Sequence, residues 1–145
     1  MSRKNNPSGK IDLVISSDQS LLNMQLIIDF ICQTYWGKDL QPEQIRKSIE
    51  NSLCFGLYAN QNQIGFARVI TDYTFFAWLA DVFILPSHHR EGYGEFLMNN
   101  ILNHEQLKEI KRWRLATRDA HEFYAKFGFF KTQHPDRLME RSNPS

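Results

Sequence analysis

The hydrophobic pattern takes a period of two from Leu53 onwards, and this change constrains the fold more than any other feature of the sequence. Three apolar runs follow in succession, "LCFGLYA", "IGFARVIT" and "FFAWLADVFIL", with the polar stretches "NQNQ" and "DYT" between them. Runs of this kind joined by short polar turns are typical of consecutive antiparallel strands. The sequence therefore predicts a three-stranded antiparallel unit that ends at Pro86.

Amphipathic helices are predicted on both sides of this unit. Asp18 is a candidate N-cap for a first helix with apolar residues at spacings of three and four, and Pro42 suits the first turn of a second helix. After the strands, one apolar helix ends near His104, and a last helix in "AHEFYAKF" ends at Gly128. The pair Asp119 and Glu122 resembles a capping box for that last helix.

The remaining short apolar segments complete the predicted sheet. "IDLVIS" and "WRLAT" have the composition of strands, and "FFKTQ" with "RLMERS" can form a closing hairpin or two edge strands. The expected fold class is α+β, one mixed and mostly antiparallel central sheet with helices on both faces. We expect residues 1–10 to be a flexible tail and residues 11–145 to form a single domain.

Composition excludes several classes of function. The formal net charge is +1, which argues against a dedicated nucleic-acid binder. No apolar run has the length of a signal peptide or a membrane span, and Cys32 and Cys54 lack metal-ligand spacing, so a cytoplasmic protein is expected. The five histidines form no ligand motif, so no metal is expected. The basic cluster from Lys108 to Arg118 is interleaved with glutamates and is interpreted as a solvated helix face.

A glycine-containing loop directly precedes the third predicted helix, in "SHHREGYGEFLMNNIL". The first N–H groups of a helix lack intrahelical acceptors and carry partial positive charge, so an anion binds there readily. Gly92 and Gly94 would let a phosphate approach these N–H groups, although such glycines can also serve only a tight turn. There is no GxxxxGK[ST] motif and no complete dinucleotide fingerprint, which argues against ATP and NAD.

This loop resembles the [Q/R]xxGx[G/A] signature of the GNAT superfamily of N-acetyltransferases, read here from His89 to Gly94. His89 stands where the family has Gln or Arg, and Arg90 beside it supplies a positive charge. A second landmark, "ATRDAHEFYAKFGF", is similar to the family's N-x-x-A-x-x-x-Y-x-x-x-G-F segment, with Thr117 in the Asn position. The two landmarks occur in the family's order on the expected elements.

The resemblance implies a splay between the fold's fourth and fifth strands that holds acetyl coenzyme A (acetyl-CoA) as co-substrate. Backbone groups of the fourth strand would pair with the pantetheine arm, and the loop amides would bind the pyrophosphate. The residues implied in coenzyme binding are Val82, Phe83, Ile84, His89, Arg90, Glu91, Gly92, Tyr93, Gly94, Glu95 and Thr117.

Two residues are candidates for catalysis. Tyr124, in the second landmark, is the predicted proton donor to the leaving thiolate, because a phenol with a pKa of about 10 stays protonated at neutral pH. Asp81, the only acidic residue of its apolar strand, is a candidate base for the amine. A structural carboxylate in the sheet is an equally good interpretation of Asp81, since only a bulge would decide which way it faces.

The predicted function is acetyl transfer from acetyl-CoA to a primary amine by direct attack in a ternary complex. The acceptor would be a small molecule or a peptide, and the aromatic residues Tyr35, Trp36, Tyr73, Phe75, Phe76 and Trp78 either line its pocket or belong to the core. The alternative is a non-catalytic module that binds acyl-CoA and regulates a partner protein. No nucleic-acid or membrane partner is expected, and a homodimer is left open.

Overall fold

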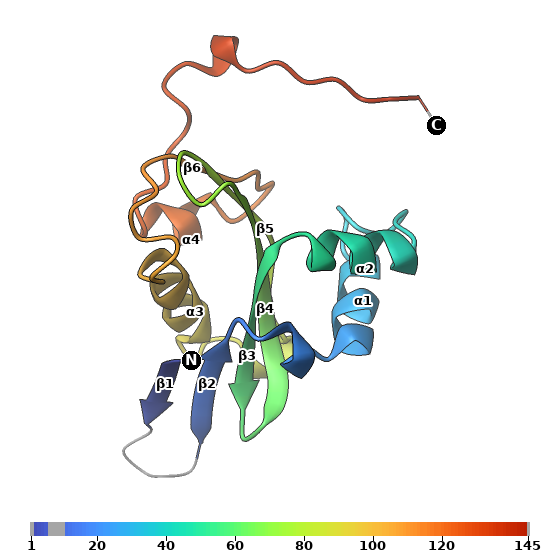
Figure 1. Cartoon of the computed structure of the whole chain (residues 1–145), viewed down its shortest axis with the longest axis vertical. Helices are drawn as coiled ribbons and strands as arrows, with labels where there is room; N and C mark the ends of the chain where they lie inside the picture. Colours follow the sequence, from blue (N-terminus) through green and yellow to red (C-terminus); the bar gives the residue numbers. More distant parts are fainter. Residues whose placement is uncertain (1, 6–10, 145) are drawn as a thin grey trace.

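The predicted antiparallel unit forms the middle of a six-stranded sheet in the computed structural model, which describes residues 2–5 and 11–144 (Figure 1). The strand order follows the chain, and every neighbouring pair is antiparallel except the last, which is parallel. The strands are β1 (Ser2–Asn5), β2 (Asp12–Ser16), β3 (Leu53–Ala59), β4 (Asn62–Thr71), β5 (Ala77–Ile84) and β6 (Trp113–Arg114).

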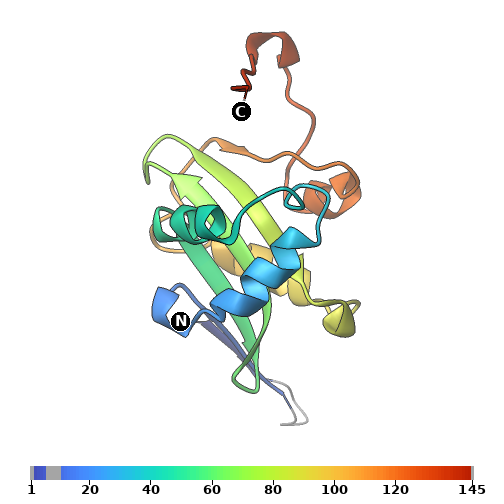
Figure 2. The same cartoon turned by 90° about the vertical axis from the view of Figure 1, so that its right-hand side faces the viewer.

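Helices cover both faces of this sheet, which confirms the predicted fold class. The elements α1 (Met24–Cys32) and α2 (Pro42–Glu50) lie on one face, and α3 (Tyr93–Leu102) and α4 (His121–Ala125) lie on the other (Figures 1 and 2). Asn23 caps α1 by accepting a hydrogen bond from the Leu26 N–H, and Pro42 occupies the first turn of α2. Asp18 caps only a short 3₁₀ turn, Gln19–Leu21, before α1.

The core is divided into two apolar clusters by the sheet. Between the sheet and α3, the side chains of Leu97, Met98 and Ile101 are fully buried against β3, β4 and β5. On the α1 and α2 face, Phe66 and Phe83 form the other cluster with isoleucines of both helices. Each fully buried aliphatic side chain contributes roughly 1.5–3 kcal/mol. Strands β3 to β5 are thus fixed from both sides, which makes them a rigid support for a site.

A bulge interrupts β5 at Asp81. Phe83 pairs with Phe66 and Ala80 pairs with Arg68, so three steps along β5 oppose two along β4. Asp81 has φ 55°, in the left-handed region that few non-glycine residues adopt. The extra residue changes which side chains of β5 face α3. Before the bulge Leu79 belongs to the core under α3, and after it Val82 and Ile84 pack against that core.

The structure describes parts of both terminal segments. Ser2–Asn5, within the expected flexible tail, pairs with β2, while residues 1 and 6–10 lie outside the described residues. The closing hairpin is wrong: from Phe129 to Pro144 the structure has only a 3₁₀ turn, Pro135–Arg137, and this exposed segment extends beyond the sheet (Figure 2). The pattern of "FFKTQ" is too short to dictate pairing without a buried face.

The predicted capping box and basic helix face are also wrong. The N-cap of α4 is Ala120, and its N–H donates to the Thr117 hydroxyl at 3.0 Å. Helix α3 ends at Leu102, so the basic residues from Lys108 to Arg118 lie on turns and on β6 instead of one helix face. In the part of the chain that the structure describes, no helix combines the length and hydrophobicity needed to span a bilayer.

Candidate active site

Strands β5 and β6 are paired over only two residues and then separate. Ala77 pairs with Trp113 and Trp78 with Arg114, and beyond them no described strand pairs with that edge of β5. A cavity of about 670 Å³ borders the second half of β5. Its lining comes from the end of α1 and the loop after it, β5, the glycine loop and α4: Phe30, Thr34, Tyr35, Trp36, Val82, Phe83, Ile84, His88, His89, Arg90, Gly92, Tyr93, Gly94, Glu95, Asp119, Ala120, Phe123, Tyr124 and Lys126.

The backbone N–H and C=O groups of successive β5 residues point alternately toward β4 and toward the cavity. The Leu85 N–H donates to the Ile64 carbonyl at 2.8 Å, and the same register makes Phe83 the next residue bonded to β4. The backbone groups of Val82 and Ile84 therefore point away from β4. Of the three predicted strand contacts, Phe83 contributes its side chain to the wall, where the ring stacks on Phe30 at 3.9 Å.

The glycine loop opens α3 without a side-chain cap. Gly92 is the N-cap residue with φ 78°, and none of its neighbours would clash with an added Cβ, so only its backbone conformation requires glycine. Gly94 makes a close contact instead, because a Cβ there would lie 3.1 Å from the Phe123 ring, which would have to shift by a few tenths of an ångström. The N–H groups of the first turn of α3 lack intrahelical acceptors and border the cavity. This end of the cavity fits a phosphate group.

His89, which replaces the family's Gln or Arg, has a local contact. Its Nε2 atom lies 2.7 Å from the Ile84 carbonyl, so the ring ties the loop to the end of β5. Arg90 follows with φ 67°, a left-handed conformation. Lys126, the C-cap residue of α4, forms an exposed ion pair with Glu95 of α3 at 3.1 Å, and both residues line the cavity.

Tyr124 lines the same cavity as the glycine loop, as the sequence predicted from its landmark. Its ring packs edge-on against Phe123 and Phe129, with centroids 5.1 Å and 6.0 Å away. Burial, with a smaller contribution from Tyr35, raises the pKa of Tyr124 to about 12. The helix that positions this tyrosine ends at Ala125 with Lys126 as its C-cap, three residues before the predicted Gly128, which has φ 91° in the turn that follows. The phenol thus stays protonated across the physiological pH range.

Asp81 lies outside the cavity lining, and each oxygen of its carboxylate accepts one hydrogen bond. Its Oδ2 accepts from Arg68 Nε at 2.8 Å, and its Oδ1 accepts from Trp36 Nε1 at 2.8 Å. The side chains of Arg68 and Asp81 are only 16% and 11% exposed. The Asp81 carboxylate therefore ties the bulge of β5 to β4 through Arg68 and to the loop after α1 through Trp36. These contacts favour the structural interpretation of Asp81.

The loop after α1 forms the wall opposite α4. Tyr35 accepts a hydrogen bond from the Arg118 N–H at 3.2 Å, and the Arg118 guanidinium lies 3.8 Å above its ring. Tyr35 and Trp36 line the cavity, whereas Tyr73 and Phe75 lie exposed at the turn between β4 and β5. The interpretation of most of these rings as core residues is wrong, because these four are exposed and Phe76 and Trp78 are only partly buried.

Glu91 and Thr117, both predicted to contact the coenzyme, are absent from the cavity lining. Thr117 caps the turn before α4, as described above. Sequence reasoning missed Phe30, Phe123 and Lys126. Phe123 and Lys126 both lie in the landmark "ATRDAHEFYAKFGF" close to Tyr124, which was a usable signal, whereas Phe30 comes from a segment that carries no motif. Among residues 2–5 and 11–144, no group of three His, Cys, Asp or Glu side chains could hold a metal.

Comparisons with known proteins agree with this geometry. The family described as "Acetyltransferase (GNAT) domain" matches residues 50–131. A provisionally named acetyltransferase of Gibberella zeae is 30% identical over 138 residues, which cover 79% of this chain and 77% of that protein. The crystal structure of a provisionally named GNAT acetyltransferase from Xanthomonas campestris pv. campestris is 44% identical with TM-score 0.87, over 91% of this chain and 94% of that one.

A more distant structure has the same fold. A Clostridium acetobutylicum protein, assigned as an acetyltransferase by prediction and crystallised with acetyl-CoA, has TM-score 0.63 at 12% identity, over 91% of this chain and 96% of that one. The fold is that of the acetyltransferases in these comparisons. The chain belongs to the GNAT acetyltransferase family.

The Arg68 and Asp81 pair yields a test of its structural role. We expect Asp81→Asn to lower the free energy of unfolding by about 1–3 kcal/mol, because a nearly buried guanidinium loses its charge partner. Asparagine tolerates the left-handed conformation, so Asp81→Asn removes the negative charge without adding backbone strain. Urea unfolding measures it, with exposed Asp29→Asn as the control. An unchanged stability would contradict the role assigned to this pair.

The raised pKa of Tyr124 predicts a pH dependence of stability. Between about pH 10 and pH 12 the unfolded chain loses the phenol proton while the native chain keeps it, so stability falls as the pH rises. We expect Tyr124→Phe to reduce this fall by about 1 kcal/mol at pH 11 relative to pH 9. Urea unfolding of both proteins at the two pH values measures the difference. An identical fall in both proteins would show that burial does not perturb this phenol.

Proposed function

We propose that this protein transfers the acetyl group of acetyl-CoA to a primary amine of a small molecule or a peptide. The observation that carries the proposal is that one cavity contains the opened edge of β5, the uncapped start of α3 and the Tyr124 phenol. The complex of the Clostridium acetobutylicum protein with acetyl-CoA supports the choice of co-substrate.

The residues around the cavity fit the two polar parts of this co-substrate. The amides from Arg90 to Glu95 would bind the pyrophosphate, since the first turn of α3 offers N–H donors and the positive end of a dipole. Arg90 and Lys126 would add positive charge at the rim. The backbone groups of Val82 and Ile84 would pair with the amides of the pantetheine arm, as a neighbouring strand does.

The proposed reaction is a direct attack of the amine nitrogen on the thioester carbonyl carbon. The C–N bond forms, the C–S bond breaks, and the thiolate leaves with the electron pair of the broken bond. Tyr124 donates its hydroxyl hydrogen to that sulfur, and the amine releases a proton to water, from which the phenol is reprotonated. The phenol interacts with the negative charge that develops on the sulfur only as the C–S bond breaks. Its hydroxyl therefore stabilises the transition state more than the bound substrates.

The elevated pKa of Tyr124 is compatible with this role. A phenol with a pKa of about 12 is a weaker acid than a free thiol with a pKa of about 8.5. A thiolate formed in the same partly buried cavity is subject to the same desolvation, which raises the pKa of its conjugate thiol. Desolvation of both groups therefore keeps the difference between their pKa values close to its value in water instead of widening it.

Asp81 is assigned a positioning role in this proposal instead of that of a base. Its carboxylate is held by Arg68 and Trp36, and using it as a proton acceptor would require breaking one of these contacts. The acceptor amine would instead reach the cavity as the free base and lie against Tyr35 and Trp36, whose rings can contact an apolar or cationic molecule.

Thiol release from acetyl-CoA in the presence of a panel of primary amines tests the proposal. We expect Tyr124→Phe to lower kcat by about 100-fold with little change in the KM for acetyl-CoA, because the hydroxyl acts after the coenzyme is bound. Tyr73→Phe, at the exposed turn, is the matched control. Tight coenzyme binding without thiol release for any amine would favour the alternative, a non-catalytic acyl-CoA-binding module.

Alanine substitutions at two glycines with positive φ test whether the glycine loop binds acetyl-CoA. Gly92 and Gly128 both have positive φ and no atom within 4 Å of an added Cβ, so alanine should cost each about 1 kcal/mol of stability. Only Gly92 belongs to the proposed pyrophosphate loop. We expect Gly92→Ala to raise the KM for acetyl-CoA about tenfold and Gly128→Ala to leave it within twofold. Equal effects on KM would contradict the assignment of the loop.

A further inference from the structure

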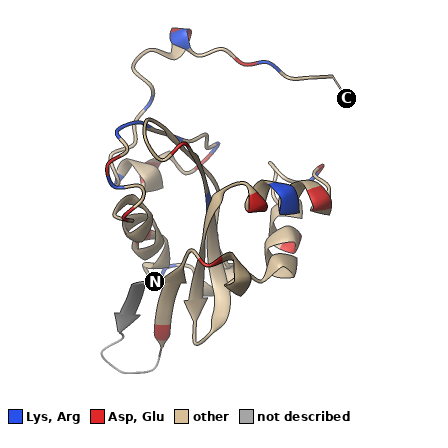
Figure 3. Ribbon diagram, viewed as in Figure 1, with Lys and Arg blue, Asp and Glu red and all other residues tan. Residues whose placement is uncertain are grey.

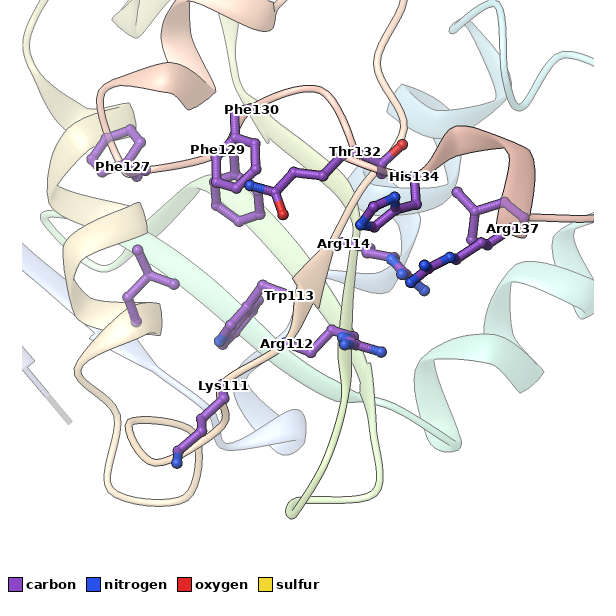
Figure 4. Close-up of a pocket in the computed structure, with 14 residues that line it drawn as sticks. Lys111, Arg112, Trp113, Arg114, Phe127, Phe129, Phe130, Thr132, His134 and Arg137 are labelled. Atoms are coloured by element: carbon purple, nitrogen blue, oxygen red, sulfur yellow. The ribbon is translucent and has the colours of Figure 1, made fainter.

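A second cavity lies at the opposite end of α3 from the glycine loop. It has a volume of about 630 Å³ and is bounded by the end of α3, by the chain that enters β6, and by the segment that follows α4 (Figure 4). No residue lines both cavities. The ten residues of α3 separate the two ends by roughly 15 Å. Nothing in the proposed acetyl transfer uses this second cavity.

Basic side chains in this cavity have no acidic partner among the residues that the structure describes. Lys111, Arg112, Arg114 and Arg137 line it together with His134, and no Asp or Glu contributes to the lining. Within residues 2–5 and 11–144, none of these four cations lies within 4.0 Å of a carboxylate. Other cations of the chain, such as Lys108 and Lys126, do form such pairs. Figure 3 shows the basic residues on the approach to β6 and on the C-terminal segment.

The basic groups converge from two separate segments. Arg114, on β6, and Arg137, in the 3₁₀ turn after α4, point toward one another beside His134 (Figure 4). Two guanidinium groups repel each other, so this arrangement is most favourable with an anion between them. The planar, doubly donating guanidinium matches a phosphate in particular, and two of them match a dianion better than a single carboxylate.

The other end of the cavity is aromatic. Trp113, Phe127 and Phe129 line it together with Phe130, a residue that is 73% exposed although it borders the cavity (Figure 4). A ligand with a negative charge at one end and a flat apolar group at the other would contact both the basic end and the aromatic end of the cavity. The volume is that of a cavity for a small molecule.

We propose that this second cavity binds a small phosphomonoester that carries an aromatic group, separately from acetyl-CoA. The phosphate lies between Arg114 and Arg137, and the ring lies against Phe129 and Trp113. The Phe129 ring also contacts the ring of Tyr124, so the ligand would lie one side chain away from the proposed proton donor.

Calorimetry with phenyl phosphate on the full chain tests this proposal. We expect binding in the submillimolar range, and an at least tenfold weaker affinity for phenol and for inorganic phosphate, each of which has only half of the required chemistry. Saturation with acetyl-CoA should change the affinity less than twofold. Displacement of phenyl phosphate by acetyl-CoA would overturn the proposal, because the probe would then occupy the coenzyme site.

Variants that each remove one positive charge test whether phenyl phosphate binds in the second cavity. We expect Arg114→Gln and Arg137→Gln each to weaken phenyl phosphate binding about tenfold or more, since each removes a charged hydrogen-bond donor. Arg46→Gln, in the exposed pair with Glu43 on α2, removes the same charge elsewhere and should have no effect. Arg137 lies in an exposed segment, so its variant is informative even if Arg114→Gln fails to fold. No binding at 5 mM probe, or equal losses in all three variants, would overturn the proposal.

Discussion

The left-handed conformation of Asp81 is the constraint on which the geometry of the site depends. It inserts one extra residue into β5, and this residue sends the side chains of Val82 and Ile84 to the face that packs on α3. An L-residue adopts this conformation at a cost of about 1 kcal/mol or more, so the surroundings must hold it. Arg68 and Trp36 do so, each through a hydrogen bond of 2.8 Å. The same carboxylate fixes the loop that carries Tyr35, so one residue positions two walls of the cavity.

Burial determines the chemistry of the phenol that lies across this cavity. The rings of Phe123 and Phe129 exclude water from Tyr124 and raise its pKa, and α4 holds it beside the glycine loop. Gly94 lets the first turn of α3 approach Phe123 closely, so the same contact shapes the loop and shields the phenol. Apolar packing contacts therefore position the residues of the site as much as hydrogen bonds do.

Periodicity predicted most of the fold, whereas the residues proposed for the site came from the resemblance to the two family landmarks. The strands β3, β4 and β5 and the helix α3 follow directly from their apolar patterns, because these elements are buried on defined faces. Gly92 and Gly94 were singled out by the loop before a helix and by its resemblance to the family signature, and Tyr124 by the resemblance of its segment to the second landmark; all three line one cavity. The role of Asp81 was left open, since alternation cannot show a bulge whose cause is a contact with distant Trp36. The hairpin after Phe129 was predicted wrongly for the same reason: an exposed segment follows its tertiary contacts and not its own pattern.

Amide hydrogen exchange of the full chain, with and without coenzyme A, tests the central claim most directly. That claim is that the opened edge of β5 and the first turn of α3 form one binding surface. The account predicts slower exchange for the amides of Val82 and Ile84 and for those from Arg90 to Glu95, with no change at Phe83, which already bonds β4. Slower exchange confined to other elements, or none at saturating coenzyme, would contradict it.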